Sequence, residues 1–145
     1  MRAVLQRVKS ASVSVDGKTV GSIGKGALVL VGIHAQDTFK TLEWMAQKII
    51  QLRYFEDAQG KMNLSLQEVE GQLLVISQFT LYGNCNEGRR PDFFEAAPGA
   101  IAKPLFDEFL KILANQIGPV QTGVFGAYME VSLVNDGPVT LILEK

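Results

Sequence analysis

Short runs of alternating apolar and polar residues occupy the beginning of the chain, and this alternation predicts strands. Residues 3–8 and 11–15 form two such runs, the second reading "ASVSV". Asp16 and Gly17 tolerate a positive φ, so they predict a tight turn into a further strand at 18–23. The chain therefore begins with antiparallel strands.

Later strands are predicted by continuous apolar runs, which are typical of strands covered on both faces. The runs at 27–33 and 73–76 are of this kind. Near the end of the chain, strands at 129–134 and 139–144 flank "NDGP", residues 135–138, which predicts a turn.

Helical spacing of apolar residues occurs twice. Between positions 39 and 50 the apolar residues fall on one face of a helix, which Asp37 is expected to cap. A second helix is predicted over 101–115, with Pro104 confined to its first turn because proline lacks an N–H donor. The region 82–99 is predicted to be a long loop, and loops of this length are often functional.

These elements predict an α+β fold, in which β-rich, barrel-like sheets are covered by two main helices. The chain has 145 residues and a mass of 15.8 kDa, which indicates a single domain, 1–145. No apolar run reaches the roughly 18 residues that cross a bilayer. The single cysteine, Cys85, permits no internal disulfide, and a cytoplasmic protein is expected.

The net charge of −1 argues against general affinity for nucleic acids, but it leaves room for a local basic patch. Candidates for such a patch are Arg2, Arg7, Lys9 and the pair Arg89 and Arg90. For any one of these residues, an ordinary solvated surface charge is the simpler interpretation.

Most conventional catalytic groups are missing from the sequence pattern. His34, the only histidine, would have to serve any Ser–His–acid triad, but nothing pairs it with Ser77 or Thr80. The sequence contains no cluster with metal-ligand spacing and no glycine-rich phosphate loop, so no metal and no cofactor are expected. The remaining candidate is a site of hydroxyl and amide groups, where backbone N–H donors stabilise an oxyanion.

Two segments carry a resemblance to a known family: "SQFTL", residues 77–81, and "NDGPVT", residues 135–140. Together they resemble the motif pair of the D-aminoacyl-tRNA deacylases. The similarity also covers "MRAVLQRVKSASVSVDG", "GKMNLSL", "GRRPDF" and "QTGVFGAYMEVSLVNDGPVT", and so spans nearly the whole chain.

The resemblance implies a homodimer that hydrolyses the ester between a D-amino acid and the 3′ end of tRNA, with glycyl-tRNA as a further candidate substrate. The resemblance also implies an active site at the dimer interface. It further implies that the Gly137-Pro138 peptide bond is cis and is presented to the partner's pocket, where rigid backbone rejects L-amino acids by collision.

The resemblance also assigns roles to residues. Thr80 is the motif threonine, either a nucleophile or, as we favour, a positioning group beside an oxyanion site formed around Phe79 and Thr80. Ser77 and Gln78 are expected to orient the ligand, while the ribose 2′-hydroxyl assists the reaction. Phe125, Ala127 and Met129 are expected to line an adenosine pocket or, equally, to belong to the core.

Two other classes of function remain open on the sequence. The chain could be a non-catalytic RNA- or protein-binding barrel that uses the same cleft. It could also hydrolyse another small acyl ester, with Thr80 as the nucleophile.

Overall fold

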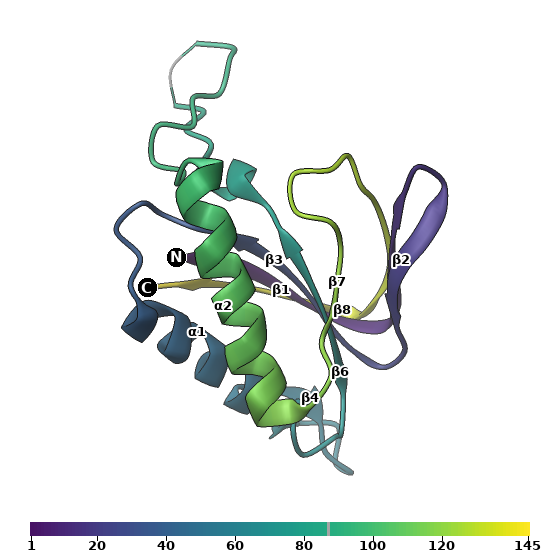
Figure 1. Cartoon of the computed structure of the whole chain (residues 1–145). Coiled ribbons are helices and arrows are strands. Elements are labelled where there is room, and N and C mark those ends of the chain that lie inside the picture. Colours follow the sequence, from purple (N-terminus) through teal and green to yellow (C-terminus); the bar gives the residue numbers. More distant parts are fainter. Residues whose placement is uncertain (87) are drawn as a thin grey trace.

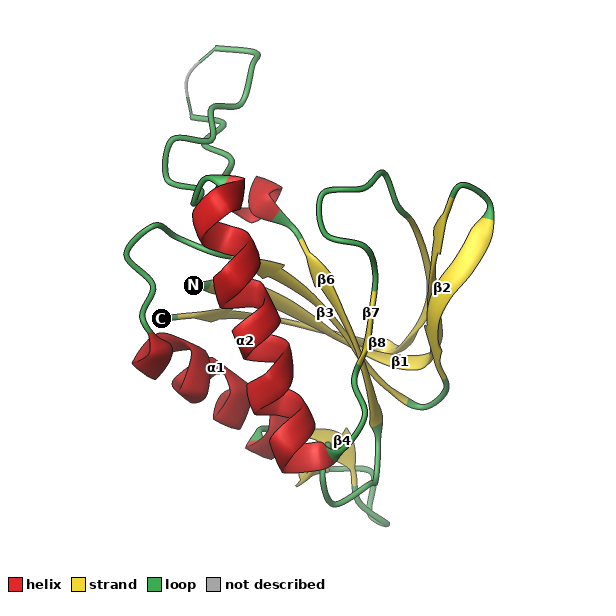
Figure 2. Ribbon diagram, in the orientation of Figure 1, coloured by secondary structure: helices red, strands yellow, loops and turns green. Residues whose placement is uncertain are grey.

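The computed structural model describes residues 1–86 and 88–145; position 87, within the predicted loop, lies outside the described residues. Two helices, α1 (Phe39–Gln51) and α2 (Gly99–Ile117), pack together on one side of a strongly curved sheet (Figures 1 and 2). Within the described residues, no helix combines the length and the apolar character that a membrane span requires.

The main sheet has the order β2-β1-β3-β6-β7, and β8 pairs with the free edge of β1. The β3–β6 and β6–β7 pairs are parallel, and the other pairs of this sheet are antiparallel. Its strands are β1 (Arg2–Val15), β2 (Lys18–Ile23), β3 (Gly26–Gly32), β6 (Gln72–Ser77), β7 (Gln121–Thr122) and β8 (Glu130–Glu144). A separate hairpin comprises β4 (Arg53–Glu56) and β5 (Met62–Ser65), which the sequence analysis did not predict.

Side chains that alternate along the strands build two separate cores. Leu74 and Val75 illustrate this, since the first packs with Val13 and Leu28 inside the curved sheet and the second packs under the helices. Gly21 on β2 lies so close to β7 that a Cβ there would be 2.7 Å from the Thr122 carbonyl oxygen. The sheet is therefore nearly closed, and the predicted barrel-like α+β fold is confirmed.

The predicted turn at Asp16-Gly17 is confirmed, because both residues have positive φ and Val15 pairs with Lys18. The predicted break between 3–8 and 11–15 is wrong. The strand β1 passes through this region with two register shifts, because β8 pairs with it on both sides of Lys9.

The turn expected at "NDGP" is also wrong. The strand β8 continues through it, and Asn135 pairs with Val8 while Thr140 pairs with Gln6. Four residues, 136–139, thus lie opposite Arg7 alone, so the segment forms a large bulge that projects from the strand.

Two expectations about helix ends are corrected. The N-cap of α1 is Thr38, because the Asp37 carboxylate accepts hydrogen bonds from the Met1 ammonium at 2.7 Å and the His34 N–H at 2.8 Å. Helix α2 begins at Gly99, which places Pro104 in its second turn. Both Pro104 and Ala100 are exposed, so water can bond the carbonyl that proline leaves without a donor.

Candidate active site

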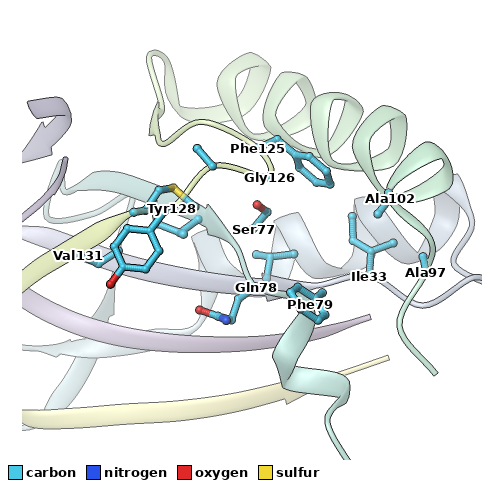
Figure 3. Close-up of a pocket in the computed structure, with 15 residues that line it drawn as sticks. Ile33, Ser77, Gln78, Phe79, Ala97, Ala102, Phe125, Gly126, Tyr128 and Val131 are labelled. Atoms are coloured by element: carbon cyan, nitrogen blue, oxygen red, sulfur yellow. The ribbon is translucent and has the colours of Figure 1, made fainter. Parts of the chain in front are cut away.

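A cavity of about 440 Å³ lies between the end of β6, the first turn of α2 and the segment that leads into β8 (Figure 3). Its lining residues are Val31, Ile33, Ile76, Ser77, Gln78, Phe79, Ala97, Gly99, Ala102, Phe125, Gly126, Ala127, Tyr128, Met129 and Val131. Apart from the phenol of Tyr128, these described residues provide no ionisable side chain. The wall is mainly apolar, with the hydroxyl of Ser77 and the amide of Gln78 as its internal polar groups.

The polar end of β6 is held firmly in the sheet. Ser77 pairs with Val31 of β3, and the Gln78 N–H donates to the Val31 carbonyl at 2.7 Å. The chain then turns into a short 3₁₀ helix, η1 (Phe79–Tyr82), in which the Leu81 N–H donates to the Gln78 carbonyl. The polar residues at the strand end therefore belong to a fixed corner of the pocket.

Thr80 lies beside the pocket and outside its lining. The side-chain amide of Gln78 donates a hydrogen bond to the Thr80 hydroxyl oxygen. Among the described residues, the N–H groups of Phe79 and Thr80 have no hydrogen-bond partner, as is usual at the start of a helix. The corner thus combines one oriented hydroxyl with two available backbone donors.

The opposite wall is the segment from Gly123 to Met129. The Ala127 N–H donates to the Val124 carbonyl at 3.1 Å, which folds the segment into a turn, and Gly126 has a φ of +77°. The Phe125 ring lies 5.9 Å from that of Phe106 on α2, so the wall is attached to the helical layer. Phe125, Ala127 and Met129 line the cavity, and Phe125 and Met129 also pack against the two hydrophobic cores.

Gly137 and Pro138 do not lie in this pocket. They project from the bulge of β8, both exposed, and the peptide bond between them is cis. Val139 donates its N–H to the Asn135 side-chain oxygen at 2.8 Å, and this bond ties the two ends of the bulge together. Within one chain, Gly137 and Pro138 therefore lie apart from the pocket corner at residues 77–80.

Arg7 supports the bulge from inside the protein. Only 4% of its surface is exposed, and its guanidinium donates to the carbonyls of Asp136 and Tyr54, both at 2.9 Å. Its Nη2 lies 3.4 Å from the Glu56 carboxylate, and its Nε lies 3.5 Å from that of Asp136. The suggestion that Arg7 belongs to an exposed basic patch is therefore wrong.

Sequence reasoning missed this function of Arg7. The available signal was its position in the strand "AVLQRV", where period-2 alternation places it on the same face as Ala3 and Leu5. Arg2 is similarly engaged, since its Nη1 donates to the Leu81 carbonyl at 3.1 Å and its guanidinium lies 4.6 Å above the Tyr82 ring.

The other candidate chemistry is not assembled. His34 lies outside the pocket lining, and its Nδ1 accepts a hydrogen bond from the Gln36 N–H at 3.1 Å. Within the described residues it makes no hydrogen bond to Ser77 or Thr80, and no group of three or more His, Cys, Asp or Glu side chains could hold a metal ion. Cys85 is exposed on the long loop.

Apolar pockets with a few hydroxyl and amide groups suit small-ligand binding, and backbone N–H donors suit ester cleavage. Comparison with known proteins identifies the family. The family described as D-Tyr-tRNA(Tyr) deacylase matches residues 4–144, and the chain belongs to it. The resemblance noted in the sequence is confirmed, and the chain is a hydrolase of the deacylase class.

Curated relatives extend the match to the full length. A protein of Thermosipho africanus named D-aminoacyl-tRNA deacylase is 57% identical over 100% of this chain and 97% of its own. One of the same name from Desulfatibacillum aliphaticivorans is 59% identical over 100% of this chain and 99% of its own.

Solved structures agree on the fold. One titled c-Myc DNA Unwinding Element Binding Protein is 44% identical, with a TM-score of 0.95 over 100% of this chain and 99% of that one. Another, titled as a probable eukaryotic D-amino acid tRNA deacylase, superposes with a TM-score of 0.88 over 98% of this chain and 97% of that one. At 19% identity it supports the fold alone.

Proposed function

We propose that the protein hydrolyses the ester between a D-amino acid and the 3′-terminal adenosine of tRNA. The products are the free D-amino acid and the intact tRNA. The observation that carries this proposal is a pocket without an ionisable base whose polar corner is built by the family motif at 77–80. A substrate with its own hydroxyl beside the ester needs little acid–base help from such a pocket. Since aminoacyl-tRNA serves translation, we expect the enzyme to act in the cytoplasm.

In the proposed reaction, water attacks the ester carbonyl and the adenosine 3′-oxygen leaves with a proton. The N–H groups of Phe79 and Thr80 bind the oxyanion, a role that backbone donors fill in other acyl-transfer sites. The neighbouring ribose 2′-hydroxyl orients the water and relays its proton. Ser77 and Gln78 hold the aminoacyl group by hydrogen bonds.

Thr80 acts in this scheme by position and not by attack. Its hydroxyl accepts a hydrogen bond from Gln78, and among the described residues no acidic or basic side chain forms a hydrogen bond with it. A threonine without a base is a poor nucleophile. The adenosine lies against the opposite wall, in contact with Phe125, Ala127 and Met129.

We further propose that the working enzyme is a homodimer in which Gly137 and Pro138 of one subunit enter the pocket of the other. The support is that this bulge is exposed, tied at both ends and braced by Arg7, yet lies away from its own subunit's pocket. Neighbouring β8 residues are apolar and exposed, with Ile142 at 73%. Rigid backbone in that place would collide with the side chain of an L-amino acid. The side chain of a D-amino acid would point out of the pocket, and glycine, which has no side chain, would also be accepted.

Two substrates test the chemistry. D-tyrosyl-tRNA ending in 2′-deoxyadenosine should be hydrolysed at least about 100-fold more slowly than the normal ester, because the assisting hydroxyl is missing. Thr80→Ala should retain substantial activity. A covalent acyl adduct on Thr80 in the mass spectrum, together with an inactive Thr80→Ala, would replace this scheme with nucleophilic attack by Thr80.

A further inference from the structure

In the loop between η1 and α2, residues 83–86 and 88–98 project away from the sheet and from α2 (Figure 1). Its base is fixed. Asn84 and Asp92 exchange two backbone hydrogen bonds, at 2.9 and 3.1 Å, and the Ala97 N–H donates to the Ile33 carbonyl at 2.8 Å. The outer part of the loop is therefore held out from the body of the protein in a defined direction.

This base is continuous with the pocket. Ala97 and Gly99 line the cavity directly. Phe93 packs edge-on against Phe79, with the ring centroids 5.0 Å apart, and Phe79 is itself a lining residue. A polymer whose terminal unit fills the pocket would therefore leave it beside the loop.

The outer part of the loop combines two kinds of side chain that bind single-stranded nucleic acid. Arg89 and Arg90 are exposed and have no ion-pair partner among residues 1–86 and 88–145. Phe94 is 93% exposed, although a phenyl group gains from being covered. Guanidinium groups bind phosphates, and aromatic rings stack on bases of any sequence.

The described acidic residues of the loop, Asp92 and Glu95, have partners of their own. The Asp92 carboxylate accepts from the Asn84 side chain at 3.1 Å and from the Phe94 N–H at 3.4 Å. The Glu95 carboxylate lies 4.0 Å from the Arg2 guanidinium. Among the described residues, neither of these carboxylates forms an ion pair with Arg89 or Arg90, so both guanidinium groups keep their donors available for a phosphate.

We propose that Arg89, Arg90 and Phe94 form an RNA-binding surface for the single-stranded nucleotides that precede the terminal adenosine of the substrate. The arginines contact phosphates, and Phe94 stacks on a base. This proposal rests on the proposed function for the identity of the substrate. It adds a second binding surface outside the pocket, which holds the RNA and takes no part in the chemistry.

The test compares two esters: D-tyrosyl-tRNA, and 3′-O-D-tyrosyl-adenosine, which can occupy only the pocket. The variants are Arg89→Gln combined with Arg90→Gln, and Phe94→Ala. Lys111→Gln, which removes an exposed lysine of α2, is the matched control. We expect KM for D-tyrosyl-tRNA to rise at least about tenfold in both variants while kcat stays within twofold, and the nucleoside ester to show no comparable loss.

Salt dependence supplies a second readout. For single strands, the logarithm of the affinity falls with the logarithm of the salt concentration, with a slope of about −0.7 per neutralised phosphate. In the double arginine variant, the plot of log(1/KM) for D-tyrosyl-tRNA against log salt should therefore be less steep by about 1.4. Phe94→Ala should leave that slope unchanged, since a phenyl group neutralises no phosphate.

Three results would overturn the proposal: an unchanged KM for the tRNA, equal losses on both esters, or a changed solution mass of Phe94→Ala. The last would mean that Phe94 covers a second copy of the chain. If the wild type cleaves neither ester, the proposed function fails. Binding of the same variants to an oligonucleotide with the 3′ end of tRNA then still tests the RNA surface, and equal affinity of all variants would refute it.

Discussion

Replacement of Arg7 by methionine should destabilise the protein by about 3 kcal/mol. Methionine fills much of the space but donates no hydrogen bond, so the carbonyls of Tyr54 and Asp136 lose donors at 2.9 Å. Each buried acceptor left unsatisfied costs about 1–3 kcal/mol. The paired carboxylates of Glu56 and Asp136 are partly exposed and can be hydrated, so they add little to this cost.

Urea unfolding at pH 7 measures this change in the free energy of unfolding. Lys9→Met is the matched control, because Lys9 lies on the same strand and its ammonium is 4.0 Å from the same Asp136, but it is mostly exposed. We expect a change below about 1 kcal/mol for the control. Arg7→Lys should recover only part of the loss, since lysine lacks the planar fork. A change within about 1 kcal/mol for Arg7→Met would refute the bracing role.

Two further predictions concern stability. Gly26→Ala should lower the free energy of unfolding by more than about 3 kcal/mol, because the new Cβ would lie 2.6 Å from the Gln72 backbone nitrogen and 2.8 Å from its carbonyl carbon. Gly99→Ala is the control: its Cβ would have no atom within 4 Å, so it should be neutral or mildly stabilising. Burial and, next, the Asp37 carboxylate raise the pKa of Tyr82 from 10.0 to about 12. The contribution of the Tyr82 phenol to the free energy of unfolding is therefore complete below pH 10 and is lost as the pH rises through about 12. Between these values, the free energy of unfolding of Tyr82→Phe should fall less steeply with pH than that of the wild type. Identical curves of unfolding free energy against pH would contradict this.

The elements that the sequence predicted well are those in which local pattern and tertiary environment agree. The Asp16-Gly17 hairpin and helix α1 are of this kind. Strands β1 and β8 were each predicted as two pieces, because Lys9-Ser10 and "NDGP" read locally as breaks. Their pairing with each other along nearly their whole length keeps both strands continuous. The hairpin β4–β5 was missed because its strands have only four residues each.

The pocket was partly predictable. The resemblance assigned Ser77 and Gln78 to the site, and the structure places them in one cavity with Phe125 and Met129. Burial of Arg7 was harder to foresee, because an arginine in an alternating strand is usually exposed. Its burial depends on two carbonyls from distant parts of the chain, that of Asp136 in the bulge opposite it and that of Tyr54 on β4.

The most direct test of the account is the rate of ester hydrolysis on D-tyrosyl-tRNA and on L-tyrosyl-tRNA with the same purified protein, measured under single-turnover conditions. The account predicts rapid release of D-tyrosine and no release of L-tyrosine above the spontaneous rate. Equal rates for the two esters, or no acceleration for the D form, would contradict it.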